Sequence, residues 1–267
     1  MVGENNKVVI VTGGSSGIGR CTASALKENG CIVYEFSRRN IPMEGVTHLS
    51  VDVTDEDAVN AAVQQVIQKE TKIDAVINCA GFGISGAVEF TAYADAKRQF
   101  DVNFFGTSNC IRAALPEMRR QGSGMIIVTS SVAGMLSIPF QAYYSASKAA
   151  LNSLVLATAN EVRPYGVRVA AIMPGDIKTG FTAARTKSNA GSSDYAALSK
   201  SVATMERDEQ NGMSPDVIAR CMYSVSRKRN PKPLRSVGLQ YKACCLLGKF
   251  LPCRLSNWIV GKMYASK

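Results

Sequence analysis

Residues 7–19 read KVVIVTGGSSGIG, and this stretch decides the fold. Its first half is a run of β-branched residues that is typical of a buried strand, and helical spacing begins after its second half. A glycine-rich turn between a strand and a helix allows the backbone to approach a pyrophosphate closely. The free N–H groups at the start of the helix then favour such an anion. The spacing TGxxxGxG in this context predicts contacts to a dinucleotide at Gly13, Ser15, Ser16, Gly17 and Ile18.

The same order of strand, turn and helix repeats along the chain. Further strands are expected at 31–37, 46–54, 73–81, 124–131 and 167–175, and helices at 20–28, 55–69, 95–120 and 144–162. Apolar strands that alternate with amphipathic helices indicate a parallel sheet with helices on both faces. A length of 267 residues fits one such α/β domain, so we predict a doubly wound fold with a single domain over 1–267.

Two segments fall outside this repeat. Residues 181–213 are rich in Ala, Ser, Asn and Gly, and they follow the last expected strand, at the edge of the sheet where ligands bind. We interpret them as a lid over the substrate. Residues 227–267 form a basic, amphipathic extension in which Pro252 is expected to separate two short helices. This extension is expected to pack on its own domain, on a sister subunit or on a membrane surface.

The charge of the chain is concentrated at one end. The formal net charge is +10, and residues 217–267 contain eleven Lys and Arg residues but no Asp or Glu. A solvated basic face that also attracts an anionic cofactor is one interpretation, and a contact with a membrane surface is another. Nucleic acid is disfavoured as a partner, because no groove-reading motif accompanies the charge.

Several other function classes are disfavoured by what the sequence lacks. The eight cysteines contain no CxxC pair, so we expect reduced thiols in a cytoplasmic protein. The first residues show no secretion leader, and no uninterrupted apolar run is long enough to span a membrane. His48 is the only histidine, which disfavours a Ser-His-Asp hydrolase and a His-ligated metal site. No metal is therefore expected.

Several motifs together resemble the short-chain dehydrogenase/reductase family. TGGSSGIG is similar to the cofactor turn of that family, and the segment Asn78 to Gly81 is similar to its NNAG motif, with Cys79 in place of the second Asn. The resemblance implies a Rossmann-type fold and a nicotinamide cofactor. It also implies that Asp52 and Val53 contact the adenine, although Asp52 alternatively caps a helix or a turn. The other cofactor contacts implied in this way are Asn78, Ala80, Gly81, Tyr144, Lys148, Pro174, Ile177 and Thr179.

A tyrosine and a lysine in the expected helix 144–162 form the candidate catalytic pair. Tyr144 and Lys148 are four residues apart and therefore share a helix face. An adjacent ammonium and an oxidised nicotinamide would favour the phenolate, bringing the pKa of Tyr144 down toward neutral pH. Family resemblance implies that Ser131 holds the substrate oxygen and that Asn103 supports a water relay to the lysine. Ser130 and Tyr143 have the same separation as Ser131 and Tyr144, but no lysine lies four residues after Tyr143.

The end of the second strand indicates which nucleotide is used. Enzymes of this family that use NAD carry an acidic residue there, whereas this chain has Ser37 followed by Arg38 and Arg39. A guanidinium can bind a 2′-phosphate through two hydrogen bonds, and a carboxylate would repel it. We therefore expect NADP(H), held in part by Arg38 and Arg39.

The remaining resemblance concerns the substrate. AGFGISGAVE at 80–89, DVNFFGT at 101–107, RNPKPLRSVG at 229–238 and FLPCRL at 250–255 are similar to the branch related to 17β-hydroxysteroid dehydrogenases. This implies interconversion of a ketone and a secondary alcohol on a bulky apolar substrate, with a hydroxysteroid or bile acid expected first. The alternatives are a lipid-ketone reductase of the acyl-dihydroxyacetone phosphate type at a membrane surface and a non-catalytic NADP(H)-binding sensor. Ser131, Met135, Phe140 and Phe181 are the expected substrate contacts, and a homodimer or homotetramer is expected.

Overall fold

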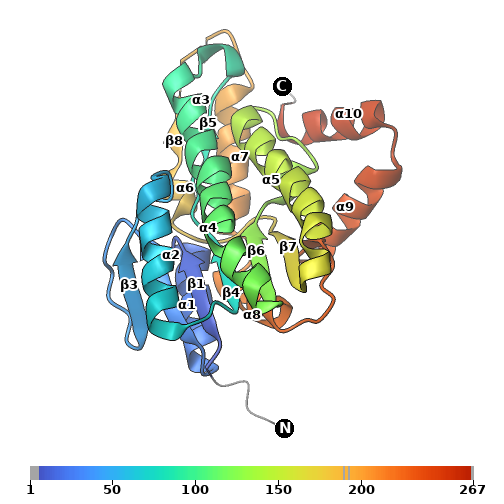
Figure 1. Cartoon of the computed structure of the whole chain (residues 1–267). Coiled ribbons are helices and arrows are strands. Elements are labelled where there is room, and N and C mark those ends of the chain that lie inside the picture. The colour runs from blue at the N-terminus through green and yellow to red at the C-terminus, as the bar shows by residue number, and fades with distance from the viewer. Residues whose placement is uncertain (1–5, 189, 192, 266–267) are drawn as a thin grey trace.

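A parallel sheet forms the centre of the computed structural model, which describes residues 6–188, 190–191 and 193–265 (Figure 1). Within these residues the sheet has seven strands in the order β3-β2-β1-β4-β6-β7-β9. The strands are β1 (Val8–Thr12), β2 (Ile32–Ser37), β3 (Val46–Ser50), β4 (Ala75–Asn78), β6 (Gly124–Thr129), β7 (Val167–Met173) and β9 (Leu234–Ser236). The order reverses between β1 and β4, and such a reversal creates the crevice in which doubly wound folds bind their ligands.

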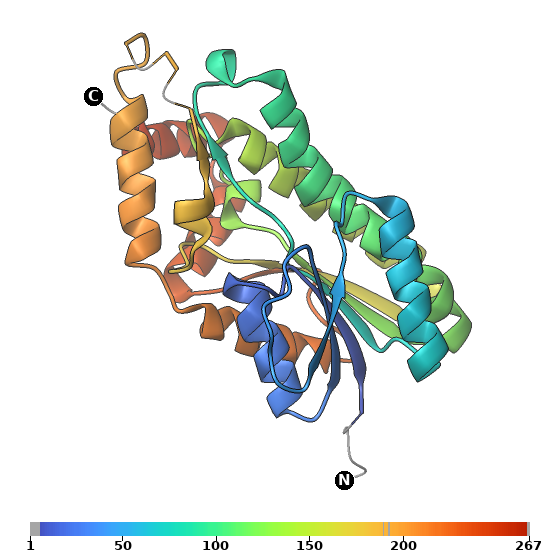
Figure 2. The same cartoon turned by 90° about the vertical axis from the view of Figure 1, so that its left-hand side faces the viewer.

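Helices cover both faces of this sheet. One face carries α1 (Gly17–Glu28) and α8 (Pro215–Ser226), and the other carries α2 (Glu56–Glu70), α4 (Gly106–Gln121) and α5 (Ala142–Glu161) (Figures 1 and 2). The packing of strand β1 explains why its sequence is apolar throughout. Val8 and Ile10 pack into the core on the α2, α4 and α5 side, whereas Val9 and Val11 pack into the core beneath α1 and α8. A strand buried on both faces needs apolar side chains at every position.

The expected helix 95–120 is divided into three parts. Helix α3 (Tyr93–Phe100) leads into a π-helical turn at Asp101–Phe105, and α4 follows it. A π-helical turn adds a residue to the helix and shifts the side chains that follow it. Sequence spacing alone predicts one continuous helix here.

The expected lid contains regular structure that its weak periodicity did not indicate. It includes α6 (Phe181–Ala184), β8 (Thr186–Lys187) and α7 (Leu198–Gln210), and β8 pairs in parallel with β5 (Ile84–Ser85). Residues 189 and 192 of the expected lid lie outside the described residues. Helix α7 stands beside the carboxyl ends of the strands, as Figure 2 shows.

The C-terminal extension forms two helices, as its sequence predicts. Strand β9 is followed by α9 (Leu239–Phe250) and α10 (Cys253–Tyr264), and Pro252 lies between the two helices. Residues 266–267 of the extension are outside the part of the chain that the structure describes. Among the described residues, no helix has both the length and the apolar character needed to cross a bilayer.

Candidate active site

A large cavity opens at the carboxyl ends of the strands. Its volume is about 640 Å³, and its walls come from the loops after β1, β2, β4, β6 and β7. Of the residues expected to bind the cofactor or substrate, it is lined by Gly13, Ser15, Ser16, Gly17, Ile18, Arg38, Arg39, Asp52, Val53, Ala80, Gly81, Ser131, Tyr144, Lys148, Pro174, Ile177, Thr179 and Phe181. Sites far apart in the sequence are therefore brought together around one space.

The glycine turn after β1 has the backbone geometry that its sequence predicts. Gly13 has a φ of +69°, and a Cβ added to it would lie 2.8 Å from the backbone N and Cα of Ala80. Only glycine fits both the conformation and the close approach. Ser16 precedes α1 in an extended conformation, and its side chain makes no capping hydrogen bond with a described residue. The N–H groups at the start of α1 thus face the cavity and can bind an anion.

Two arginines and an aspartate surround the end of β2. The Nη1 atom of Arg38 lies 3.8 Å from Oδ2 of Asp52, and Nη2 of Arg39 lies 3.5 Å from the Ser15 hydroxyl. Both contacts are long, and the Arg38 side chain is 76% exposed. Asp52 accepts hydrogen bonds from the N–H and hydroxyl of Thr54, whereas α2 is capped by Asp55. The structure therefore places Asp52 in a turn on the cavity wall.

The carboxylate nearest to these arginines along β2 points elsewhere. Oε2 of Glu35 lies 2.6 Å from Nδ1 of His48 on β3, and the Glu35 side chain is buried against Gly14. Glu35 is therefore not part of the cavity wall, and its contact gives His48 a structural partner.

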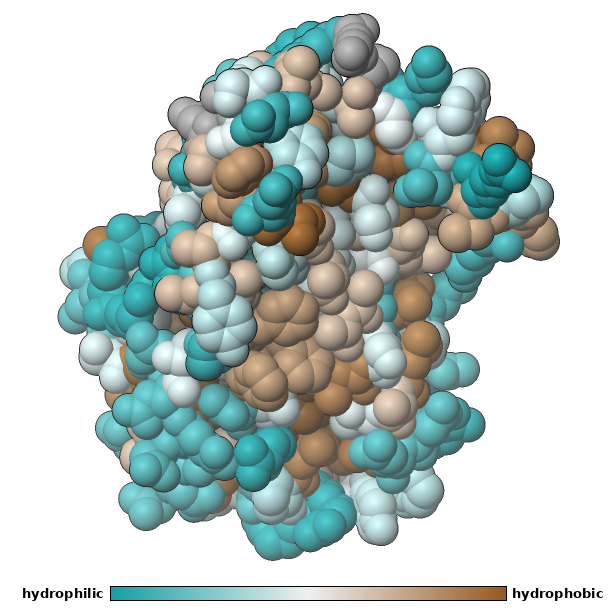
Figure 3. Space-filling model, turned by 90° about the horizontal axis from the view of Figure 1, so that it is seen from above, coloured by the Kyte–Doolittle hydropathy of each residue, from teal (hydrophilic) through white to brown (hydrophobic). Residues whose placement is uncertain are grey.

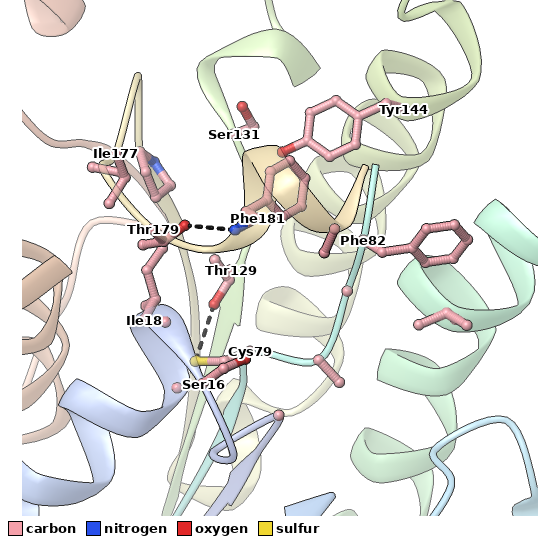
Figure 4. Close-up of a pocket in the computed structure, with 18 of the residues that line it drawn as sticks. Ser16, Ile18, Cys79, Phe82, Thr129, Ser131, Tyr144, Ile177, Thr179 and Phe181 are labelled. Atoms are coloured by element: carbon pink, nitrogen blue, oxygen red, sulfur yellow. Dashed lines mark hydrogen bonds between the residues drawn. The ribbon is translucent and has the colours of Figure 1, made fainter. Parts of the chain in front are cut away.

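The segment after β4 lines the cavity with its backbone and with Cys79. The thiol of Cys79 accepts a hydrogen bond of 3.3 Å from the Thr129 hydroxyl (Figure 4). Burial raises the pKa of Cys79 to about 11, so the thiol stays neutral at physiological pH. The Asn78 side chain is buried behind this segment and donates to the carbonyl of Ile127, so it does not line the cavity.

Tyr144, Ser131 and Lys148 meet at the inner end of the cavity. Tyr144 and Ser131 point their hydroxyls toward the same space, with the ring of Phe181 beside Tyr144 (Figure 4). Nζ of Lys148 lies 5.7 Å from the centre of the Tyr144 ring and donates a hydrogen bond of 2.8 Å to the carbonyl of Thr129. This arrangement could hold a carbonyl oxygen near two hydroxyls and an ammonium.

The rival pair of the same spacing is arranged differently. Ser130 is buried, and its hydroxyl donates to the carbonyl of Lys148, while Tyr143 is not part of the cavity wall. The geometry therefore favours Ser131 and Tyr144 as the pair that faces a ligand.

The pKa of Tyr144 in the chain without cofactor is set mainly by burial. Burial raises the pKa of Tyr144 to about 12, although its hydrogen bond with Ser131 acts in the opposite direction. The carboxylates of Glu209 and Asp176 raise it further, and Arg185 lowers it. Burial also lowers the pKa of Lys148 to about 8, which weakens its positive charge. In the chain alone, desolvation is thus the largest influence on this pKa, and Tyr144 holds its proton at neutral pH.

Asn103 lies in the π-helical turn and outside the cavity wall. Its Oδ1 accepts from the N–H of Phe82, and its Nδ2 donates to the carbonyl of Phe82 and to the hydroxyl of Ser147, each at 3.1 Å. Asn103 therefore fixes the loop after β4 to helix α5, which carries Tyr144. The water relay to Lys148 stays a prediction.

The loop after β7 closes the other side of the cavity. Ile177 bridges to Met213, and the hydroxyl of Thr179 accepts a hydrogen bond from the N–H of Phe181 (Figure 4). Of the residues expected to contact the substrate, Met135 and Phe140 lie off the cavity wall. The ring of Phe140 instead packs edge-on against Tyr195, 6.0 Å away.

The wall residues that were not anticipated from the sequence include four ionisable ones, Asp176, Glu209, Tyr241 and Tyr264. Asp176 is part of the segment after the Pro174-Gly175 pair, so its position could have been noticed. Glu209 comes from α7, and the two tyrosines come from α9 and α10. No sequence spacing relates these helices to the loop after β7, so only the fold brings them together.

Comparisons with known proteins agree with this geometry. A 3-ketodihydrosphingosine reductase of Bacteroides thetaiotaomicron is 39% identical over 264 residues, covering 97% of this chain and 98% of that protein. A dehydrogenase/reductase SDR family protein 7-like of Drosophila melanogaster is 30% identical and covers 96% of this chain and 80% of the relative. The crystal structure of a short-chain dehydrogenase from Streptomyces avermitilis superposes with a TM-score of 0.83 at 29% identity, covering 97% of each chain.

The family model described as short chain dehydrogenase matches residues 7–190, which include the glycine turn, Ser131, Tyr144, Lys148 and the loop after β7. The chain is therefore an oxidoreductase that belongs to the short-chain dehydrogenase family.

Proposed function

We propose that this protein reduces a long-chain lipid ketone that carries an ammonium group beside the carbonyl, using NADPH. A relative that covers nearly the whole chain at 39% identity is named 3-ketodihydrosphingosine reductase, and that ketone has this chemistry. The similarity favours the lipid-ketone alternative over the hydroxysteroid or bile acid that the sequence suggested first. Both remain predictions, as do the cytoplasmic location and the homodimeric or homotetrameric state.

The observation that carries the proposal is the carboxylate of Asp176 on the same cavity wall as Tyr144. Asp176 is close enough to raise the pKa of Tyr144, so a cation next to the reacting carbonyl would lie near it. Burial raises the pKa of Asp176, and binding an ammonium would offset that cost. A steroid ketone has no such cation. An acyl-dihydroxyacetone phosphate carries an anion, which Asp176 would repel.

Two other charged side chains on the cavity wall, Glu209 and Arg98, already have partners. Glu209 forms an ion pair with Arg185 and accepts a hydrogen bond from Thr182. Arg98 pairs with Asp95 at 3.4 Å and stacks on Phe82, 4.8 Å from its ring centre. The rest of the inner wall includes Phe82, Ile138 and Phe181, which suit an aliphatic chain.

The residues of the outer cavity fit a nicotinamide dinucleotide with a 2′-phosphate. Gly13 leaves room for close backbone approach, and the start of α1 presents N–H groups to an anion. Arg38 and Arg39 are held only by long contacts, so their guanidinium groups are available for a phosphate. When bound, a reduced nicotinamide would supply the hydride for the carbonyl carbon.

The chain itself would supply the proton and hold the oxygen. Tyr144 carries its proton at neutral pH and would donate it from Oη to the ketone oxygen. The Ser131 hydroxyl would donate a hydrogen bond to the same oxygen as negative charge develops there. Lys148, 5.7 Å from the tyrosine ring centre, would stabilise the phenolate that remains.

The direct test is to measure NADPH oxidation by the purified protein with three ketones, each at the same dissolved concentration. These are a short-chain 2-amino-3-ketone, a steroid ketone and an acyl-dihydroxyacetone phosphate, with NADH as the cofactor control. The N-acetylated amino ketone is the matched substrate, because it keeps the shape and loses the charge. We expect turnover of the amino ketone, a loss with its acetylated form, and a smaller difference between the two in Asp176→Asn.

Three results would contradict the proposal. Equal turnover of the charged and acetylated ketones would remove the role of Asp176, and turnover of the steroid alone would restore the hydroxysteroid prediction. Tight NADPH binding without turnover of any ketone would favour the non-catalytic sensor.

A further inference from the structure

The two C-terminal helices are loosely attached to the domain. Helices α9 and α10 stand at its outer edge, at the right of Figure 1. Among the described hydrophobic side chains of the two helices, only Cys245 and Val260 are buried. Tyr241 and Tyr264 reach the wall of the active-site cavity, so this helix pair lies beside the cavity.

Large apolar side chains are exposed on this pair far more than elsewhere. Of the fourteen large hydrophobic residues that the described part of the chain exposes, eight belong to α9 and α10. They are Leu239, Leu246, Leu247, Phe250, Leu255, Trp258, Ile259 and Met263. Single exposed apolar residues need no explanation, but a concentration of this kind marks a contact surface.

Basic residues are interspersed with these apolar side chains. Lys242, Lys249, Arg254 and Lys262 belong to the same two helices, and residues 217–267 contain no acidic residue. Nζ of Lys262 lies 5.9 Å from the centre of the Trp258 ring. Figure 3 shows brown and teal residues side by side at the right-hand edge, where α9 and α10 project.

This mixture matches an anionic lipid surface better than a second copy of the chain. Self-association through the pair would place like charges against each other, and the cores of protein interfaces are depleted in lysine. In the headgroup layer, by contrast, lysine stems can extend toward phosphates while Leu, Phe and Trp enter the acyl boundary. Anionic headgroups also attract basic segments directly.

We propose that α9 and α10 bind the headgroup layer of an anionic membrane and place the mouth of the active-site cavity against the bilayer. A lipid ketone would then enter past Tyr241 and Tyr264 without crossing water. The membrane contact stands independently of the proposed substrate, and only this entry route rests on the proposed function.

Trp258 provides a direct readout of the contact. It is the only tryptophan in the chain and is 59% exposed, so its emission reports the environment of α10 alone. The full-length protein, without substrate or cofactor, is mixed with vesicles of phosphatidylcholine or of phosphatidylcholine with phosphatidylglycerol. We expect a blue shift of the emission and co-sedimentation with the anionic vesicles at low salt, and a loss of both at high salt.

Two variants distinguish binding through this surface from non-specific adsorption to vesicles. Phe250 is 80% exposed at the end of α9, so Phe250→Glu should leave the fold intact. This variant should bind the anionic vesicles about tenfold more weakly, or more weakly still. Tyr93→Glu is the matched control, because Tyr93 is 82% exposed on α3 and should bind vesicles like the wild type. Circular dichroism and turnover of a short-chain ketone check the fold of both variants.

Several outcomes would overturn the proposal. One is an unchanged Trp258 emission with the protein remaining in the supernatant at low salt. Binding to neutral vesicles that is as tight as binding to anionic vesicles, and that does not change with salt, would refute the charge argument. A blue shift that depends on protein concentration without vesicles, with a dimer in light scattering, would assign the surface to a second copy. Because no assay of vesicle binding uses a substrate, these failures are distinguishable from failure of the proposed function.

Discussion

The hydroxyl of Tyr241 donates a hydrogen bond of 2.7 Å to Oδ2 of Asp176, and this contact joins helix α9 to the loop after β7. The Tyr241 ring also fills the space beside Gly175, where an added Cβ would come within 2.2 Å of a ring carbon. A residue from the C-terminal extension thus completes the wall of the active-site cavity and holds the carboxylate that we expect to bind the substrate cation.

Removing this hydroxyl should weaken substrate binding more than catalysis. Tyr241 lowers the pKa of Asp176, which burial raises, so Tyr241→Phe should leave less of the carboxylate ionised at neutral pH. We expect a higher KM for the amino ketone, a nearly unchanged kcat, and a loss of about 1 kcal/mol in the free energy of unfolding. Steady-state kinetics and urea unfolding measure these quantities. Tyr223→Phe, at a hydroxyl that accepts from Arg227 outside this cavity, should leave KM unchanged.

The adjacent tyrosines 143 and 144 offer a matched pair for the proton transfer. Tyr144→Phe keeps the ring but removes the proton donor, so kcat should fall about 10²- to 10⁴-fold while NADPH binding is retained. Tyr143→Phe should keep near-wild-type turnover, because Tyr143 does not line the cavity. Equal losses in the two variants would show that Tyr144 has no special role. Fluorescence titration with NADPH checks that the cofactor site is intact.

Because of Lys148, the free energy of unfolding of the cofactor-free protein should change with pH in the alkaline range. Burial lowers its pKa to about 8 from 10.5, so between these values the unfolded chain holds a proton that the folded chain has released. The contribution of Lys148 to the free energy of unfolding therefore rises with pH across this window, by on the order of 3 kcal/mol. Lys148→Met should lack this rise.

The test is urea unfolding of wild type and Lys148→Met from pH 7.5 to 10.5. Groups that titrate in both proteins cancel in the difference between them. Parallel stability curves would mean that Lys148 is not desolvated in the folded state.

The two arginines after β2 should set the cofactor preference. We expect the double variant Arg38→Ala/Arg39→Ala to lower kcat/KM for NADPH relative to NADH about 10- to 100-fold, as the loss of charge-assisted hydrogen bonds predicts. Arg119→Ala, on the exposed side of α4, is the control for loss of an exposed arginine outside the cavity and should keep the wild-type ratio. A double variant with the wild-type ratio would argue against NADP(H) recognition by these residues.

The glycine turn should not tolerate a Cβ at its first position. Gly13→Ala would combine a φ of +69° with a 2.8 Å approach to Ala80, so cofactor binding should be lost and the free energy of unfolding should fall by about 1–3 kcal/mol. Gly122→Ala is the control, since its φ of +66° is similar but a Cβ there meets no described atom within 4 Å and the residue lies off the cavity wall, so NADPH binding should be kept. Calorimetric titration with NADPH and thermal unfolding of both variants compare the two sites.

Local patterns were sufficient for much of the fold and for the shared helix face of the candidate catalytic pair. The apolar run of β1 and the glycines after it require a buried strand and a tight turn, whatever the rest of the chain does. The four-residue spacing of Tyr144 and Lys148 places both on one helix face wherever that helix packs. The expected break at Pro252 is confirmed. It too is a local effect, because the proline ring fixes φ and removes the backbone N–H at that position.

Side-chain environments depended on residues that are distant in the sequence. The pKa of Tyr144 rises because Phe181 and the surrounding wall exclude water, and no spacing within α5 indicates this burial. Phe140 and Asn78 adjoin motifs, yet contacts with Tyr195 and Ile127 turn their side chains away from the cavity.

The sequence by itself therefore determined the parallel α/β architecture, the glycine-rich turn and the spacing of the two residues that we propose move the proton, because each depends on backbone geometry within a few residues. Only the tertiary structure decided which side chains line the cavity around that pair. Asp176 and Tyr241 are 65 residues apart, and their contact exists because β9 returns the chain to the edge of the sheet and delivers α9 to the cavity. Chain reversal over such distances is set by the packing of the whole domain, which local patterns do not encode.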